Sequence, residues 1–228
     1  MRHLTATLIV VGILIAGCRS GSEDEAKTST TTSTTKPPLP VLLDNALPPL
    51  LLSPEEINAA MGTTEMAMTN NRVEMSEDSA LVEPKECLAI DSSAQQAVYA
   101  GSRYTTVRDQ TFNDGDNFTH YAEQAVVLFP TAKDAGDFIT TSAQQWPACH
   151  EYSHPQSGTV WRPGPISNAN GIVSVITIQQ NPKAGGWACG RALAARNNVV
   201  VDVNTCSANP ADTAVKIAGQ IAARVQPQ

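Results

Sequence analysis

The chain carries apolar residues in two different periodic patterns. Segments 103–112, 119–129 and 172–179 are rich in β-branched and aromatic residues, which predicts strands. In 130–146 and 210–225 the apolar residues recur three and four positions apart, which predicts amphipathic helices. Hairpin strands with interspersed helices indicate an α+β fold with an antiparallel sheet flanked by helices.

A further short helix is predicted by its capping residues. Ser53 is a preferred N-cap, Pro54 suits the first helical position, and Glu56 completes a capping box. We expect this helix to run to Met61 and to end at Gly62. The polar and acidic segment that follows, to residue 86, is expected to be irregular.

A hairpin is predicted around the dipeptide Asn197-Asn198. Asparagine tolerates positive φ, so the pair suits a two-residue type I′ turn between two β-rich segments. Cys189 and Cys206 each lie eight residues from this turn, and the register makes them a non-hydrogen-bonded pair. Side chains approach most closely at such pairs, so a Cys189–Cys206 disulfide follows.

The same register divides the hairpin into two faces. One face is apolar and is expected to meet the core: Ala192, Ala194, Val199, Val201 and Val203. Arg191 and Asp202 are diagonal neighbours on the other face, beside the disulfide, and could pair. One interpretation is a solvated ion pair of small energetic value. The alternative places both on a cleft wall, and Arg191 and Asp202 are therefore the candidate ligand-binding residues.

Residues 1–17 have the features of an export signal. A short apolar run at 8–16 follows Arg2 and is too short to span a bilayer. It ends in Ile-Ala-Gly before Cys18, which is typical of a bacterial lipobox, so we expect Cys18 to carry lipid. Residues 18–47 are rich in Thr, Ser and Pro and are expected to form a lipidated tether, with the folded domain at 48–228.

The cysteine count agrees with lipidation and with export. Setting Cys18 aside, four of the five cysteines remain, an even set that suits two disulfides in an oxidising compartment. With Cys189 and Cys206 paired, Cys87–Cys149 follows by elimination. The protein is thus expected at the cell membrane, held by its lipid and facing the extracytoplasmic space.

Composition narrows the function classes. The 228 residues are 42% apolar and 16% charged, with a net charge of −7, which argues against nucleic-acid binding. No run of about 18 apolar residues occurs, so a membrane-spanning helix is not expected. We expect a monomer that binds no cofactor and no metal; neither a G-x-G-x-x-G dinucleotide motif nor a P-loop occurs.

One motif suggests catalysis. His150, Glu151 and His154 fit H-E-x-x-H, in which a helix places two imidazoles on one face to bind zinc and glutamate acts as base. Prolines at 147 and 155 argue against a helix here. On an extended strand the two histidines would lie about 13 Å apart, too far to share a zinc ion.

The stretch 50–228 resembles the PknH-like extracellular sensor domain of actinobacterial receptor kinases and freestanding lipoproteins. The matching segments are Leu51–Ser53, Tyr104–Arg108, Gln124–Val127, Trp146–Cys149, Gly186–Cys189 with Arg191, and Asn198–Val203. The resemblance implies one α+β domain with two disulfides and an open cleft for an unknown ligand. It favours a non-catalytic, lipid-anchored sensor or binding protein with a cell-envelope ligand; the alternative is a secreted zinc hydrolase.

Overall fold

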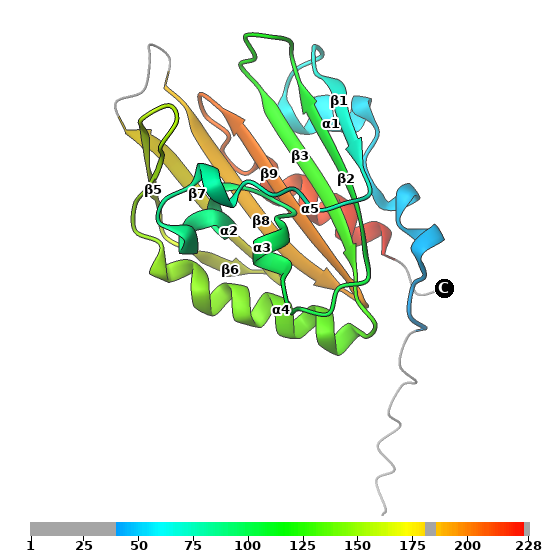
Figure 1. The fold of residues 1–228 in the computed structure, drawn as a ribbon. Helices are drawn as coiled ribbons and strands as arrows, with labels where there is room; N and C mark the ends of the chain where they lie inside the picture. The colour runs from blue at the N-terminus through cyan, green and yellow to red at the C-terminus, as the bar shows by residue number, and fades with distance from the viewer. Residues whose placement is uncertain (1–39, 181–185, 226–228) are drawn as a thin grey trace, which may run out of the picture. The chain divides into compact units, whose positions relative to one another are not determined.

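The computed structural model describes residues 40–180 and 186–225, which contain one continuous antiparallel sheet (Figure 1). Its strand order is β1-β2-β3-β9-β8-β7-β5-β4, and β6 pairs with β7. The strands are β1 (Ala67–Arg72), β2 (Thr106–Asn113), β3 (Tyr121–Leu128), β4 (Tyr152–His154), β5 (Thr159–Pro163), β6 (Ser167–Ala169), β7 (Ile172–Gln180), β8 (Ala188–Arg196) and β9 (Val199–Ser207). The expected α+β architecture is confirmed.

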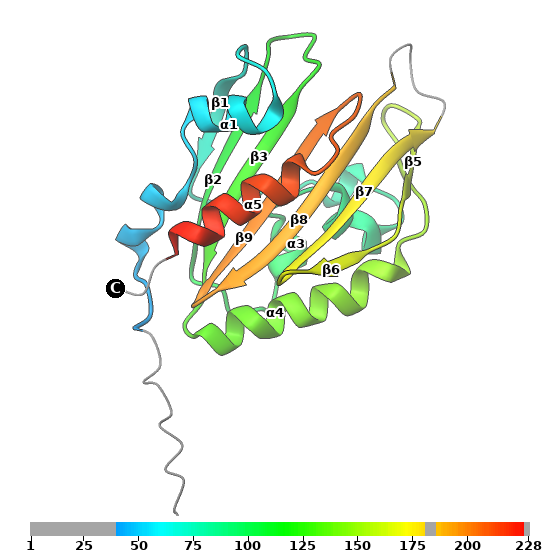
Figure 2. The same ribbon diagram turned by 180° about the vertical axis from the view of Figure 1, so that it is seen from behind.

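Helices cover both faces of the sheet (Figures 1 and 2). On one side lie α1 (Pro54–Met61) and α5 (Thr213–Arg224); on the other lie α2 (Leu88–Asp91), α3 (Gln96–Tyr99) and α4 (Ala132–Gln145). Short 3₁₀ turns occupy Asp44–Ala46, Pro48–Leu50, Ser79–Leu81, Lys85–Cys87 and Trp146–Ala148. None of the helices within the described ranges is both long enough and apolar enough to cross a membrane.

The core consists of two apolar layers, one on each side of the sheet. The layer under α5 contains the hairpin residues that were predicted to meet the core: Ala192, Ala194, Val199, Val201 and Val203. Residues of α5 at three- and four-residue spacing pack against them: Ala214, Ile217, Ala218 and Ile221. The layer under α4 includes Phe138, Trp146 and both disulfides. Because both faces are covered, β9 is buried along its whole length.

Helix α1 begins and ends at the residues that the sequence predicts. Ser53 Oγ accepts from the Glu56 amide, and a Glu56 carboxylate oxygen accepts from the Ser53 amide at 2.8 Å, which completes the capping box. Gly62 ends the helix with φ +73°, a conformation that costs glycine little. The helix buries Ile57 and Met61 against the layer under α5.

The predicted hairpin register and both disulfides are confirmed. Asn197 takes φ +50° in the turn, and Cys189 lies opposite Cys206 with a Cα–Cα distance of 4.1 Å. Cys87 and Cys149 form the second bond, with a Cα–Cα distance of 5.1 Å. This second bond joins the start of α2 to the segment that follows α4.

The strand predictions need correction in three respects. Residues 63–86 were expected to be irregular, yet β1 forms there as an exposed edge strand with the sequence AMTNNR. The strand expected from residue 103 begins at Thr106, since Arg103 has φ +71° and leaves the extended conformation. The short strands β4, β5 and β6 were not predicted. Polar edge strands lack the apolar alternation that sequence reasoning detects.

The folded unit begins before residue 48, which corrects the expected tether boundary. Leu42 and Leu47 are buried in the layer under α5. The Asn198 side chain holds Leu42 from both sides, accepting from its amide at 2.7 Å and donating to its carbonyl at 3.0 Å. The expected signal peptide at 1–17, the lipidation site Cys18 and the tether up to residue 39 lie outside the described residues.

Candidate functional site

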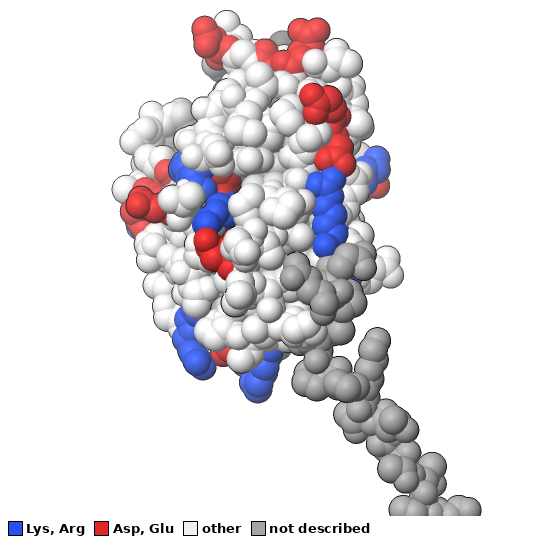
Figure 3. Space-filling view, turned by 90° about the vertical axis from the view of Figure 1, so that its right-hand side faces the viewer, with Lys and Arg blue, Asp and Glu red and all other residues white. Residues whose placement is uncertain are grey.

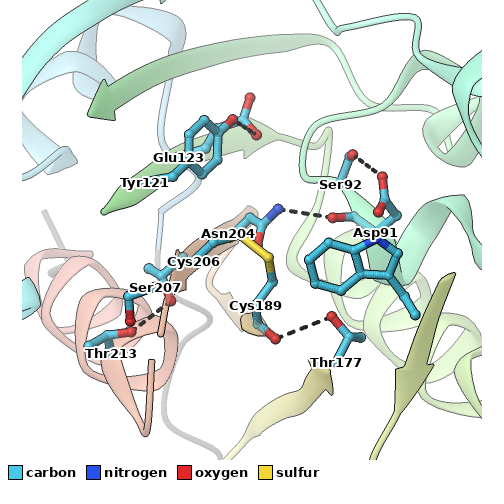
Figure 4. Close-up of a disulfide and its surroundings, with 12 residues drawn as sticks. Asp91, Ser92, Tyr121, Glu123, Thr177, Cys189, Asn204, Cys206, Ser207 and Thr213 are labelled. Carbon is cyan, nitrogen blue, oxygen red and sulfur yellow. Dashed lines mark hydrogen bonds between the residues drawn. A yellow bond between two sulfur atoms is a disulfide. The ribbon is translucent and has the colours of Figure 1, made fainter. Parts of the chain in front are cut away.

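A cavity of about 540 Å³ lies over the face of the sheet that carries α2, at the end of β9 where Cys206 lies. Residues between positions 78 and 121 supply one part of its lining: Asp78, Leu81, Asp91, Ser92, Phe118 and Tyr121. The β4–β5 hairpin supplies the rest: His154, Gln156 and Ser157. Figure 4 shows Tyr121 on one side and Asp91 with Ser92 on the other, above the Cys189–Cys206 disulfide. We call this cavity the cleft.

Phe118 and Tyr121 line the cleft, and the ring of Phe118 also contacts that of Trp187, which does not line it. Phe118, in the turn between β2 and β3, is 42% exposed. Its ring centroid lies 6.1 Å from that of Tyr121 and 6.0 Å from that of Trp187. The three rings therefore form a continuous apolar surface, with Phe118 at its exposed centre.

The polar side of the cleft is held by specific hydrogen bonds. Asp91 accepts from His154 Nε2 at 2.8 Å and from Ser92 Oγ at 2.8 Å (Figure 4 shows the serine bond). Its backbone carbonyl accepts from Asn204 Nδ2 at 2.9 Å, which joins α2 to β9. Asp78 accepts from the buried Gln95 side chain at 2.8 Å. Both carboxylates are thus fixed before any ligand arrives.

Next to the cleft, the sheet carries a buried pair of acidic side chains. Asp109 and Glu123 are 0% and 4% exposed, and Arg72 contacts both, at 3.3 and 3.0 Å. Glu123 also accepts from Ser93 Oγ at 2.5 Å. Burial, followed by the charge of Glu123, raises the pKa of Asp109 to about 9. Asp109 is therefore protonated at neutral pH, which removes one of two buried negative charges.

Arg191 and Asp202 do pair, but the interpretation as a solvated ion pair is wrong, and neither residue lines the cleft. Each is 2% exposed, and Arg191 Nη1 lies 2.6 Å from Asp202 Oδ1. Arg191 also donates to the carbonyl of Ala89, and Asp202 accepts from the Ala94 amide and the Tyr99 hydroxyl. The pair holds the α2–α3 segment on the sheet. This face of the hairpin was not predicted to be covered, because the α2–α3 segment that covers it is distant in sequence.

The H-E-x-x-H segment is extended and does not form a helix. It runs into β4, where His154 Nε2 contacts Asp91 and Glu151 contacts Arg162 Nε at 2.7 Å. The motif's spacing brings two imidazoles together only on a helix, so the arrangement zinc catalysis needs is not formed. Across residues 40–180 and 186–225, no three His, Cys, Asp or Glu side chains are grouped closely enough to hold a metal ion.

The aromatic residues that sequence reasoning considered for a cleft divide between core and surface. Trp161 is buried and stacks on Tyr152, while Tyr104 packs against Tyr99. Trp187 alone among them reaches the aromatic surface, through Phe118. Phe118 was not singled out, although a phenylalanine next to a turn rich in Asn, Asp and Gly is a detectable signal of an exposed ring.

The charged residues are sparse on the face beside β1. Figure 3 shows this face as mostly uncharged, with Asp and Glu side chains gathered at the upper end, which is the end of the β2–β3 turn in Figure 1. Close to that end, hydrogen bonds from His120 and Thr119 lower the pKa of Asp114, although burial alone would raise it. Lower on the same face Lys and Arg lie beside Asp and Glu, so the excess of acidic groups is confined to the end of the β2–β3 turn (Figure 3).

Comparison with known proteins identifies related chains. The model of the PknH-like extracellular domain matches residues 43–224. Serine/threonine-protein kinase PknH from Mycobacterium bovis and from Mycobacterium tuberculosis are each 34% identical over 195 residues, covering 83% of this chain and 32% or 31% of the kinase. The crystal structure of the extracellular domain of PknH from Mycobacterium tuberculosis matches with a TM-score of 0.77 and 33% identity, covering 82% of this chain and 97% of that domain.

Proposed function

Because the chain belongs to the PknH-like extracellular domain family, we propose that it is a non-catalytic, lipid-anchored sensor protein that binds a cell-envelope ligand in the cleft. Its place is outside the cytoplasm, as the family's extracellular domain implies. The chain spans about a third of the length of the kinases that it matches. The proposal therefore concerns the extracellular domain and includes no phosphorylation.

The cleft carries this proposal. Its volume of about 540 Å³ falls within the range of about 300–1,000 Å³ of small-molecule sites. Aromatic surface on one side and fixed carboxylates on the other match the usual composition of such sites, in which few polar groups orient a ligand against apolar walls. Two disulfides brace the domain, one of them directly beneath the cleft, so little ordering is required on binding.

The position of the cleft supports capture of a ligand away from the membrane. Pro40, where the described chain begins, accepts from Asn197 at the hairpin turn, and the cleft lies at the opposite end of β9. Eight residues of extended strand separate the two ends by about 24 Å. Because residue 39 joins the domain at Pro40, a lipid on Cys18 would be connected to the end of β9 that lies opposite the cleft.

The groups within the cleft favour binding over turnover. His154 donates to Asp91 through Nε2. Its other ring nitrogen, Nδ1, lies 3.3 Å from the hydroxyl oxygen of Thr159. Thr159 already accepts from the indole of Trp161 and is not among the residues that line the cleft. A nucleophile must face the bound substrate, so this histidine is better explained as a support for Asp91.

The test uses the full chain expressed in an actinobacterial host. We expect Cys18→Ala to move the protein from the membrane fraction to the soluble extracytoplasmic fraction, and intact mass to show loss of acyl chains. We expect wild-type protein to capture cell-envelope material that mass spectrometry can identify. Phe118→Ala should abolish capture, whereas Val73→Ala, which truncates a 63% exposed apolar side chain that does not line the cleft, should not. Capture unaffected by Phe118→Ala would contradict the assignment of the cleft.

A further inference from the structure

The geometry of the cleft points to a neutral saccharide as its ligand. We draw this inference on top of the proposed function, because it names the chemical class that the same cleft would take. It depends on three properties of the described lining residues: their charge, the arrangement of the aromatic rings, and the way that the carboxylates are held.

Charge excludes an anionic ligand. The described residues that line the cleft include Asp78 and Asp91 and contain no lysine or arginine. The one lining side chain that could become cationic, His154, already donates to Asp91. Phosphate, sulfate and carboxylate groups are recognised by arginine, lysine or free backbone amides, so an anionic lipid or acidic glycan would meet repulsion here.

The aromatic rings form a row and do not enclose a point. Phe118 is the shared neighbour of Tyr121 and Trp187, and its plane is tilted by 39° from the first and 56° from the second. An aromatic cage for a quaternary ammonium ion requires ring faces directed at one centre. The exposed ring of Phe118, the central member of this row, instead offers one apolar face, which suits the apolar C–H face of a pyranose ring.

The polar groups are arranged to serve hydroxyls. Asp78 is held from two sides by the buried Gln95, which donates to its carboxylate at 2.8 Å and accepts from its amide at 2.9 Å. Asp91 is held in the same way by His154 and Ser92. Fixed carboxylates accept hydrogen bonds from hydroxyl groups without reorganisation, and the side chains of Gln156 and Ser157 add donors to the rim. A sugar hydroxyl, being both donor and acceptor, satisfies both kinds of group.

The test measures binding of the purified full chain to three immobilised or titrated probes. These are an array of neutral oligosaccharides, a matched set of sialylated oligosaccharides, and spermidine as the cationic alternative. We expect binding to neutral oligosaccharides, with affinity lowered at least about tenfold by Phe118→Ala and by Asp78→Asn. Ile178→Ala, which truncates a 54% exposed side chain on the opposite face of the sheet, should leave affinity unchanged.

The outcomes separate this inference from the proposed function. Absence of neutral-glycan binding, tighter binding of the sialylated set, or Phe118-dependent binding of spermidine would each overturn the saccharide assignment. If envelope capture still depended on Phe118 in that case, the proposed ligand-binding function would stand with another ligand class. Glycan binding that both Phe118→Ala and Asp78→Asn leave intact would show that the saccharide binds elsewhere, and would also overturn the inference. Melting temperature and circular dichroism establish that each variant is folded.

Discussion

Arg191 and Asp202 form an ion pair at 2.6 Å in which both side chains are 2% exposed. The guanidinium also stacks over Trp146, 5.7 Å from the ring, and donates to the carbonyl of Val203 at 2.6 Å. Through Ala89 and Ala94 the two residues bind the segment that covers the sheet. The pair therefore determines where α2, and with it Asp91 of the cleft, lies relative to β8 and β9.

Breaking this pair from one side should destabilise the domain strongly. Arg191→Met leaves the Asp202 carboxylate buried without its cation, so we expect the free energy of unfolding to fall by about 3–5 kcal/mol. Urea denaturation measures the loss. Lys133→Ala, which removes an exposed pair with Asp137 on α4, is the control and should cause no resolvable change. Equal effects of the two substitutions would contradict the structural role assigned to Arg191.

Stability should depend on pH through Asp109. Its folded-state pKa is raised to about 9, while in the unfolded chain it is near 4, so between these values the folded state holds one proton more. Its contribution is full below about pH 4 and is lost as the pH rises towards 9, by at most about 1.4 kcal/mol per pH unit. Asp109→Asn should flatten this decline. Urea titrations at pH 5, 7 and 8.5 compare the slopes, and parallel slopes for variant and wild type would rule out the assignment.

The two disulfides should contribute unequally. The Cys87–Cys149 bond spans 62 residues and the Cys189–Cys206 bond spans 17. In the chain-entropy account these constrain the unfolded state by about 4 and 3 kcal/mol. We therefore expect the double substitution to alanine at Cys87 and Cys149 to lower stability more than the same change at Cys189 and Cys206. Non-reducing peptide mapping of the wild type checks the pairing, and a peptide joining Cys149 to Cys189 would refute it.

Asn198 should be needed to hold the N-terminal segment on the domain. It is 1% exposed and bonds to both backbone groups of Leu42 and to the carbonyl of Phe129, at 2.8 Å. Asn198→Ala leaves these groups unpaired, so we expect a loss of about 2–3 kcal/mol and faster proteolysis near Leu42. Asn170→Gly, a change at another asparagine with positive φ that lies far from Leu42 in sequence, is the matched control. Protease resistance equal to wild type in Asn198→Ala would contradict this role.

The cleft could be predicted only in part. Local patterns identify α4, α5, the capped helix α1 and the β8–β9 hairpin, because each depends on residues close together in sequence. The disulfide beneath the cleft follows from the same hairpin geometry. Phe118 and Trp187 meet across 69 positions, and Asp91 meets His154 across 63, so no local pattern contains these contacts.

What the sequence by itself determined is therefore helices α1, α4 and α5, strands β2, β3, β7, β8 and β9, the hairpin register and the pairing of the four cysteines within the domain. Those properties depend on periodicity, turn chemistry and strand geometry, which act over short distances along the chain. Only the tertiary structure decided that Arg191 and Asp202 are buried, that Leu42 and Leu47 belong to the core, and that the H-E-x-x-H segment is extended. Burial depends on which distant segment covers a face, and here residues 88–99 cover the face that the hairpin pattern alone predicted to be exposed.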